Sequence, residues 1–500
     1  MTSNGRLLLG VDVGTTSVKA SIYDRVGNLL AESSEPARVD RLGDGRIEQD
    51  PAEIWRAVSD AVRALPNKED VVSVGVCGHS PTLILFDAHG QPIRPAILWQ
   101  DRRAAAEAAE LKERLGDRAA VVLGGPLPVT PSYPHPRLLW LRRHEPNVLA
   151  RAAHALDTKD WVNFRLTDVV ASDPWSAKAL TNMATGRPIE AWRELLGVDP
   201  SIAPPTRPVS SPCGPLSAEA ADALGLRPGV TVAIGWTDGG CAMLGTGCFA
   251  QPGVAYDVAG TSEVIGTTVP SPPSDPRIQN APGPDPRWTL MMGPTQSSGA
   301  SVTWLGAVLG VEPREVVDLA STAPPGADGL LFLPYLEGER APIWDPHARG
   351  GFVGLLASHT RAHMARAVLE GVAHSARHVL ETIEEIAGRG FHEVRVVGGG
   401  SRSPLWNQIK ADLLGRPVRA TGAAETTSLG AAMLGAVAAG VFPSLDAAAA
   451  SLVRLGDSYP PHAELRATYD AAHRRYRELY PRLRDLFAES TPSPGGRGQG

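Results

Sequence analysis

The hydrophobic pattern near the N-terminus predicts three strands joined by tight turns. Residues 7–13 (LLLGVDV) form a nearly continuous apolar run. Along 17–24 (SVKASIYD), apolar and polar residues alternate, which is typical of a strand with one buried face. The VGN sequence at 26–28 predicts a turn into a third strand.

Three further segments show a clear pattern. The run VVSVGVCG at 71–78 is apolar and rich in valine, as in a strand buried on both faces of a sheet. Residues 101–116 favour a helix ended by Gly116. Apolar residues at helical spacing predict a long amphipathic helix over 364–386. Proline-rich stretches predict loops at 126–136 and 270–286.

The same order of elements occurs twice. The strand, Gly-Thr turn and strand of 7–22 are echoed at 253–269, and a strand followed by a glycine-containing turn occurs at 71–80 and again at 392–403. Two matches in the same order favour a duplicated α/β architecture whose second half begins near residue 250. Chance recurrence of common Gly-Thr turns is the alternative.

Composition is that of a globular protein and argues against several functions. The chain has 500 residues, so two or more domains are expected, and 43% of them are hydrophobic. A net charge of −6 argues against a broad nucleic-acid surface. No segment has the apolar length of a bilayer span or the pattern of a signal peptide. The four cysteines form no CxxC pair, which predicts reduced thiols in a cytoplasmic protein.

The two Gly-Thr turns are candidate phosphate sites. Glycine leaves backbone N–H groups accessible, and Thr15, Thr16 and Thr261 add hydroxyls. Other nucleotide motifs are missing. None of the six lysines follows a glycine, so there is no GxxxxGK[ST] loop, and GGGSRS at 398–403 lacks the third glycine of a dinucleotide fingerprint.

Asp12 lies two residues before the first Gly-Thr turn, where its negative charge would repel a phosphate. A divalent cation between the two groups removes this conflict, because Mg²⁺ binds carboxylate and phosphate oxygens together. Asp12 is therefore predicted to hold Mg²⁺, directly or through water. The alternative is an aspartate that only accepts hydrogen bonds from the turn.

A second acid, Asp238, follows the apolar run at 230–234 and precedes two glycines and a stretch of small residues. A carboxylate after a strand, near an interdomain crevice, is common in α/β active sites. In phosphoryl transfer it can accept the proton of the attacking hydroxyl. The alternative is an ordinary turn aspartate before glycine.

A rival chemistry is suggested by GHSPT at 78–82, where a serine follows a strand as in the GxSxG nucleophile elbow. Thr82 replaces the last glycine, however, and Pro81 directly follows Ser80. Both departures argue against a serine hydrolase, although that hypothesis stays open.

The chain resembles the FGGY carbohydrate kinases, and within them the xylulokinase branch, over roughly residues 6–485. The resemblance is carried by nine stretches in order: GVDVGTTSVKASIYD, RPAILWQDRR, PRLLWLRRHEP, DTKDWVNFRLT, GWTDGG, DVAGTSE, FLPYLEGERAPIWDPHARGGFVGL, VVGGGSRSPLWNQIKADLLGRPV and ETTSLGAAMLGA. It implies ATP-dependent phosphorylation of a sugar or polyol. It also implies two duplicated actin/hexokinase-like (ribonuclease H-like) α/β ATPase domains flanking a cleft. We expect an N-terminal domain at 1–249, a C-terminal domain at 250–489 and a disordered tail at 490–500.

The resemblance also implies roles for individual residues. Asp238 matches the catalytic base, and Asp12 matches the residue near Mg²⁺. The residues implied to hold ATP are Thr15, Thr16, Lys19, Thr261, Gly299, Thr303, Gly399 and Gly400. The residues implied to contact the sugar are His79, Ser80, Trp99, Asp101, Tyr133 and Asp238.

One element departs from the family. Xylulokinases usually carry Gln-Met-His-Gly where this chain has His79, Ser80, Pro81 and Thr82. This element contacts substrate hydroxyls in the family, so its replacement puts D-xylulose in doubt. A loop variant without effect on specificity is the alternative. The sequence leaves open which sugar or polyol is used and which hydroxyl is phosphorylated.

We therefore expect a kinase of a small sugar or polyol that uses ATP and Mg²⁺ and has no nucleic-acid or membrane partner. A homodimer is left open. The alternative is an ATPase of the same fold without sugar transfer, as in the chaperone relatives.

Overall fold

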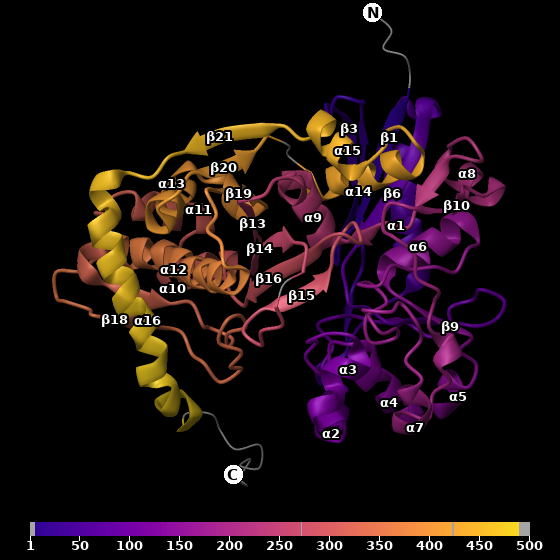
Figure 1. The fold of residues 1–500 in the computed structure, drawn as a ribbon, viewed down its shortest axis with the longest axis horizontal. Helices are drawn as coiled ribbons and strands as arrows, with labels where there is room; N and C mark the ends of the chain where they lie inside the picture. Colours follow the sequence, from indigo (N-terminus) through magenta and orange to yellow (C-terminus); the bar gives the residue numbers. More distant parts are fainter. Residues whose placement is uncertain (1–5, 272, 423–424, 490–500) are drawn as a thin grey trace, which may run out of the picture. The chain divides into compact units, whose positions relative to one another are not determined.

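The computed structural model describes residues 6–271, 273–422 and 425–489, and contacts divide them into two compact units (Figure 1). Unit 1 comprises the described parts of 1–250, 280–290 and 423–454. Unit 2 comprises those of 251–279, 291–422 and 455–500. The predicted tail at 490–500 lies outside the described residues.

Unit 1 contains a mixed sheet built on the strands that the hydrophobic pattern predicts. Its N-terminal strands pair antiparallel and are β1 (Leu7–Val13), β2 (Ser17–Tyr23) and β3 (Leu29–Pro36). The buried strand β6 (Val71–Gly78) is parallel to β1. The sheet is completed by β10 (Pro212–Pro215), β11 (Thr231–Ala233) and β12 (Trp236–Thr237). The order is β10-β11-β6-β1-β2-β3, with β12 also paired to β6.

The second large sheet, most of whose residues belong to unit 2, has the order β15-β16-β14-β13-β19-β20-β21. Its strands are β13 (Val254–Ala259), β14 (Glu263–Val269), β15 (Gln279–Pro282), β16 (Thr289–Thr295), β19 (Glu393–Val397), β20 (Val418–Thr421) and β21 (Leu455–Tyr459).

The two sheets repeat the same pairing scheme, so the predicted internal duplication is confirmed. In each sheet a Gly-Thr turn joins two antiparallel strands, β1 and β2 in the first sheet and β13 and β14 in the second. The first strand of each pair is parallel to a later one, β1 to β6 and β13 to β19. Each sheet then continues with one more parallel strand and an antiparallel strand. In the first sheet β11 is parallel to β6 and β10 is antiparallel to β11. In the second sheet β20 is parallel to β19 and β21 is antiparallel to β20.

Helix α14 (Thr426–Ala438) returns to unit 1 and packs on β1, β6 and α9 (Asp238–Thr246). Its small residues allow backbones to approach closely. A side chain at Gly75 would overlap the carbonyl of Ala431, and one at Gly10 would overlap that of Ser428. Glycine is therefore required by the space between strand and helix.

The other helices cover the sheets and their insertions. In unit 1 they are α1 (Pro51–Ala64), α2 (Ala105–Leu115), α3 (Ala119–Leu123), α4 (Pro134–His144), α5 (Pro146–Leu149), α6 (Thr158–Thr167), α7 (Ala191–Leu195), α8 (Ala218–Leu224) and α15 (Leu445–Leu452). In unit 2 they are α10 (Gly299–Leu309), α11 (Pro313–Ala320), α12 (Arg361–Ala387), α13 (Pro404–Leu414) and α16 (Arg466–Glu489). Short strands are β4 (Asp40–Arg41), β5 (Ile47–Gln49), β7 (Ile84–Phe86), β8 (Ala96–Ile97), β9 (His154–Leu156), β17 (Leu331–Leu333) and β18 (Gly351–Val353).

Three sequence-based boundaries need correction. The helix predicted from residue 101 begins at Ala105, because the Asp101 carboxylate pairs with Arg103 and accepts a hydrogen bond from its N–H. The loop predicted to reach residue 136 ends earlier, because Pro134 occupies the first turn of α4, where a missing N–H costs nothing. The stretch predicted as a loop at 270–286 contains β15 at the edge of its sheet. The long helix expected at 364–386 is confirmed as α12.

All four cysteines are buried, and none of them forms a disulfide. None of the described helices has the length and hydrophobicity of a membrane-spanning segment.

Candidate active site

Three parallel strands of unit 1 end at the same edge of its sheet. The register places Asp12 of β1 beside Cys77 of β6, and Cys77 beside Trp236 of β12. The chain that follows these strands carries the first Gly-Thr turn, the His79–Thr82 element and Asp238. Because β1 and β12 both flank β6, their backbones are about 10 Å apart. The fold thus gathers residues from three distant parts of the sequence.

Asp12 is a half-buried carboxylate that has few protein donors. The Cys77 thiol donates to its Oδ1 at 3.5 Å. Burial raises the pKa of Asp12 to about 7, and the negative charge of Asp238 adds to the rise. Among the described residues, no lysine or arginine forms an ion pair with Asp12 within 4.0 Å. Its oxygens are therefore available to a hard cation.

Asp238 is also half-buried and is the first residue of α9. Thr237 caps this helix, because its Oγ1 accepts a hydrogen bond from the N–H of Gly240 at 3.3 Å. The N–H of Gly239 donates to Asp238 Oδ1 at 2.6 Å. Burial raises the pKa of Asp238 to about 6, despite this hydrogen bond. A carboxylate with a pKa near neutrality is suited to accept a proton.

The first Gly-Thr turn has backbone donors that are not used within the protein. No acceptor among the described residues takes a hydrogen bond from the N–H of Gly14, Thr15 or Thr16. The Trp99 indole, 40% exposed, donates to Thr15 Oγ1 at 3.3 Å. Lys19 on β2 forms an ion pair with Glu425 at 2.8 Å. This turn has the free N–H groups that an anion needs.

The second Gly-Thr turn, in unit 2, is joined to the start of α10. The N–H groups of Ser298 and Ala300 donate to the carbonyl of Thr261, at 2.9 and 3.1 Å. One turn further along the helix, Thr303 Oγ1 donates to the carbonyl of Gly299 at 3.2 Å. No acceptor in the described chain takes the N–H of Thr261. The structure therefore brings Thr261, Gly299 and Thr303 together.

The glycine-rich turn after β19 adds Gly399 and Gly400 to this group. Because β19 is parallel to β13, this turn and the second Gly-Thr turn follow the same edge of the sheet. A Cβ atom at Gly400 would lie 3.0 Å from the Cβ of Ala259. These five predicted nucleotide residues of unit 2 thus lie near one another.

Ser80 belongs to a polar network whose other two members the sequence analysis missed. Its hydroxyl donates to Asp157 Oδ2 at 2.5 Å and accepts from Lys178 Nζ at 2.7 Å. Both partners are buried, at 4% and 2% exposure. One signal in the sequence was available, because Lys178 is the single charged residue between 174 and 186.

The other residues predicted to contact the sugar have varied surroundings. His79 is buried, its Nδ1 lies 3.0 Å from Thr82 Oγ1, and burial lowers its pKa to about 4. Asp101 is buried, pairs with Arg103 and accepts from the N–H of Ile47 at 2.6 Å. Tyr133 is half-buried and precedes the first turn of α4. Their contact with a sugar stays a prediction.

The surroundings of Ser80 do not fit a serine hydrolase. A nucleophile elbow requires a strand, a sharp turn and then a helix. Here β6 leads through Pro81 into the short strand β7. Among the described residues, no histidine forms a hydrogen bond with Ser80.

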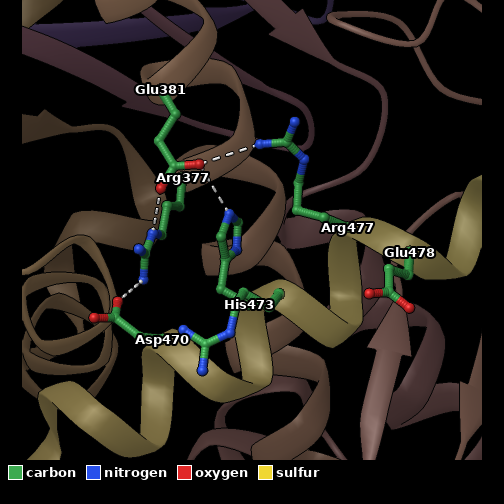
Figure 2. Close-up of a pocket in the computed structure, with 7 residues that line it drawn as sticks. Arg377, Glu381, Asp470, His473, Arg477 and Glu478 are labelled. Carbon is green, nitrogen blue, oxygen red and sulfur yellow. Dashed lines mark hydrogen bonds and ion pairs between the residues drawn. The ribbon is translucent and has the colours of Figure 1, made fainter.

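A separate cavity of about 420 Å³ lies in unit 2 between α12 and α16 (Figure 2). Its charged groups are largely paired with one another. Arg377 binds Glu381 at 2.7 Å and Asp470 at 2.8 Å, and Arg477 and His473 bind Glu381 at 3.2 Å. None of the residues predicted to hold phosphate or sugar lines it. We interpret it as a salt-bridged helix contact.

Comparison with known proteins gives two matches that together cover most of the chain. Residues 7–245 match the N-terminal domain of the FGGY family of carbohydrate kinases, and residues 255–439 match its C-terminal domain. A xylulose kinase of Escherichia coli (strain K12) is 30% identical over 493 residues, which are 96% of this chain and 100% of that protein. A glycerol kinase of Citrifermentans bemidjiense is 33% identical over 461 residues, 87% and 90% of the two chains. The crystal structure of xylulose kinase from Rhodospirillum rubrum superposes with a TM-score of 0.87 at 30% identity, covering 97% of this chain and 100% of that one.

Proposed function

The chain belongs to the FGGY family of carbohydrate kinases, and we propose that Asp238 is the general base for transfer of a phosphoryl group from ATP to a hydroxyl of a small sugar or polyol. Membership makes the protein a phosphotransferase with an alcohol group as acceptor. The relatives named above act on different acceptors, xylulose and glycerol, so the acceptor is part of the proposal.

The observation that carries the proposal is the position and pKa of Asp238. Its carboxylate is half-buried at the edge where β1, β6 and β12 end, and its pKa of about 6 leaves it deprotonated at neutral pH. Such a group accepts the proton of an attacking hydroxyl as the new O–P bond forms. The Gly239 N–H and the Thr237 cap orient it.

The surroundings of Asp12 fit a magnesium ion. The carboxylate is half-exposed and unpaired with any described cation, and it lies beside a turn with free N–H groups. One or two carboxylates suffice for Mg²⁺, whose other ligands are phosphate oxygens and water. When bound, MgATP supplies the phosphoryl group and neutralises its developing charge.

The two Gly-Thr turns are the proposed phosphate contacts. In unit 1, the N–H groups of Gly14, Thr15 and Thr16 would bind phosphate oxygens. In unit 2, the N–H of Thr261 would do the same, and the small residues Gly299 and Gly400 would let a nucleotide approach the backbone.

ATP turnover with a panel of acceptors tests the proposal. Consumption of ATP by the purified enzyme would be measured with Mg²⁺ and with pentuloses, hexuloses, tetritols, pentitols, glycerol and sugar acids. We expect at least one compound to stimulate turnover and to appear as a phosphate ester by mass spectrometry. Turnover that no compound stimulates, or that yields only free phosphate, would instead favour an ATPase without sugar transfer.

A further inference from the structure

Lys178 is a buried cation without a direct ionic partner. It is 2% exposed, and its Nζ donates to Ser80 Oγ at 2.7 Å and to the carbonyl of Trp175 at 3.0 Å. Among the described residues, no carboxylate lies within 4.0 Å of this nitrogen, and no third acceptor takes its remaining N–H. An ammonium has three donors, and buried charges are ordinarily paired. The same nitrogen lies 4.8 Å from the centroid of the Trp175 ring. One N–H of Lys178 therefore has no hydrogen-bond acceptor among the described residues.

Asp157 is a carboxylate held as an acceptor. The N–H groups of Thr82 and Thr158 donate to its Oδ1 at 2.9 and 2.8 Å, and Ser80 donates to its Oδ2 at 2.5 Å. Burial raises the pKa of Asp157, but the Lys178 charge and these three hydrogen bonds oppose the rise and favour the ionised form.

These two partners fix the polarity of the Ser80 hydroxyl, that is, the directions in which it donates and accepts hydrogen bonds. A serine hydroxyl has one hydrogen and two lone pairs. Lys178 can only donate and ionised Asp157 can only accept, so the hydrogen is directed to Asp157 and one lone pair to Lys178. Ser80 is half-buried, whereas its partners are buried. What it can offer a ligand is its second lone pair.

We propose that Ser80, oriented by Asp157 and Lys178, makes the enzyme select a polyol hydroxyl and reject a keto or carboxylate oxygen at the same position. A hydroxyl can donate to Ser80 and at the same time accept from the free N–H of Lys178. A keto or carboxylate oxygen has no hydrogen to donate, so its lone pairs would oppose that of Ser80. This inference rests on the proposed kinase function and names its acceptor class.

The network and the candidate base follow paired strands of one sheet, in which Gly78 of β6 lies opposite Thr237 of β12. Ser80 follows β6, and Asp238 follows β12, its parallel neighbour. The charges of Asp157 and Lys178 both influence the pKa of Asp238. Ser80 and Lys178 are then specificity residues that contact the substrate, and Asp157 is a positioning residue.

Matched pairs of acceptors test the inference in the full-length enzyme. Each pair differs at one carbon: xylitol and D-xylulose, ribitol and D-ribulose, and D-sorbitol and D-gluconate. ATP turnover would give kcat/KM for both members of each pair. In the best pair we expect the polyol to exceed its keto or carboxylate partner by about 10-fold or more, since an unpaired polar group in a site is strongly unfavourable.

Substitution of Asp157→Asn should invert the polarity of Ser80. The amide oxygen can still accept from Thr82 and Thr158, while the amide nitrogen would donate to Ser80 and turn its hydrogen toward the ligand. The ratio of polyol to keto kcat/KM should fall about 10-fold. Asp60→Asn, at an exposed position of α1, is the matched control and should leave the ratio unchanged.

Ser80→Ala and Ser80→Thr give an independent answer if Asp157→Asn does not fold. The alanine variant should have a kcat/KM for the polyol that is about 10-fold lower, while kcat/KM for the keto partner should change less than 3-fold. The threonine variant, which keeps a hydroxyl, should restore the preference for the polyol. Ser59→Ala on α1 is the control.

The outcomes are distinguishable. A higher kcat/KM for the ketose or aldonate in the wild type, or equal changes in both members of each pair on Ser80→Ala, would overturn this inference and leave the kinase function intact. Absence of stimulated turnover with every compound would overturn both.

Discussion

The negative charge of Asp238 raises the pKa of Asp12, since both carboxylates lie at the edge of unit 1 where strands on either side of β6 end. A like charge nearby favours the protonated form of a carboxyl group. A cation held by Asp12 would remove much of this conflict. The relationship therefore links a predicted metal ligand to a predicted base within one compact unit.

Replacement of Asp238 by asparagine should abolish most turnover but preserve folding. Asparagine keeps an oxygen for the Gly239 N–H but cannot accept a proton, so we expect kcat to fall about 10²–10⁴-fold. Steady-state kinetics with the best acceptor would measure it, with Asp222→Asn on the exposed surface of α8 as control. Full turnover in Asp238→Asn would exclude a general-base role.

The pH dependence of kcat/KM should show a limb near pH 6. Asp238 acts only when deprotonated, and its pKa of about 6 means that activity rises with pH and levels off above that value. At low Mg²⁺ concentration the limb should move toward pH 7, the pKa of Asp12, because a bound cation favours the ionised carboxylate. A profile that is flat from pH 5 to 8 would contradict both assignments.

Asp12→Asn should weaken the binding of magnesium. Loss of a negative ligand lowers affinity for Mg²⁺, so we expect the concentration for half-maximal activity to rise about 10-fold or more. Titration of activity with MgCl₂ at constant ATP would measure it. If Asp12 instead only stabilises its turn, the thermal stability would fall and the Mg²⁺ requirement would stay as in the wild type.

The same substitution should raise stability at pH 8. The pKa of Asp12 rises from 3.8 to about 7 on folding, so the folded state binds more protons between these values and stability falls as pH increases through them. Removing the carboxyl group should recover about 1–3 kcal/mol at pH 8 and almost nothing near pH 3. Urea unfolding at both pH values, without Mg²⁺, would measure the difference against Asp60→Asn.

Gly75→Ala should destabilise unit 1. The added Cβ would overlap the carbonyl of Ala431 on α14, and two backbones would have to separate. We expect a loss of about 1–3 kcal/mol or more. The control is Gly351→Ala on β18, where a Cβ meets no atom within 4 Å. Equal unfolding midpoints for the two variants would show that the contact between β6 and α14 is not tight.

The local elements and the two Gly-Thr turns could be predicted from the sequence alone. Strands β1, β2 and β6 and helix α12 follow from the period of their apolar residues, and glycine followed by threonine marks the turns, because these signals depend only on neighbouring residues. The matched order of two such turns also determined the duplication, which both sheets repeat.

The residues that surround Ser80 could not be predicted from the sequence, because the fold brings them together from distant positions. Lys178 lies 98 residues and Asp157 lies 77 residues along the chain from it, and Lys19 lies 406 residues from its partner Glu425. Such pairings depend on how strands align and where long insertions fold back, and no local period encodes them. The polarity of a hydroxyl likewise depends on both of its partners at once, so it appears only when the three side chains meet.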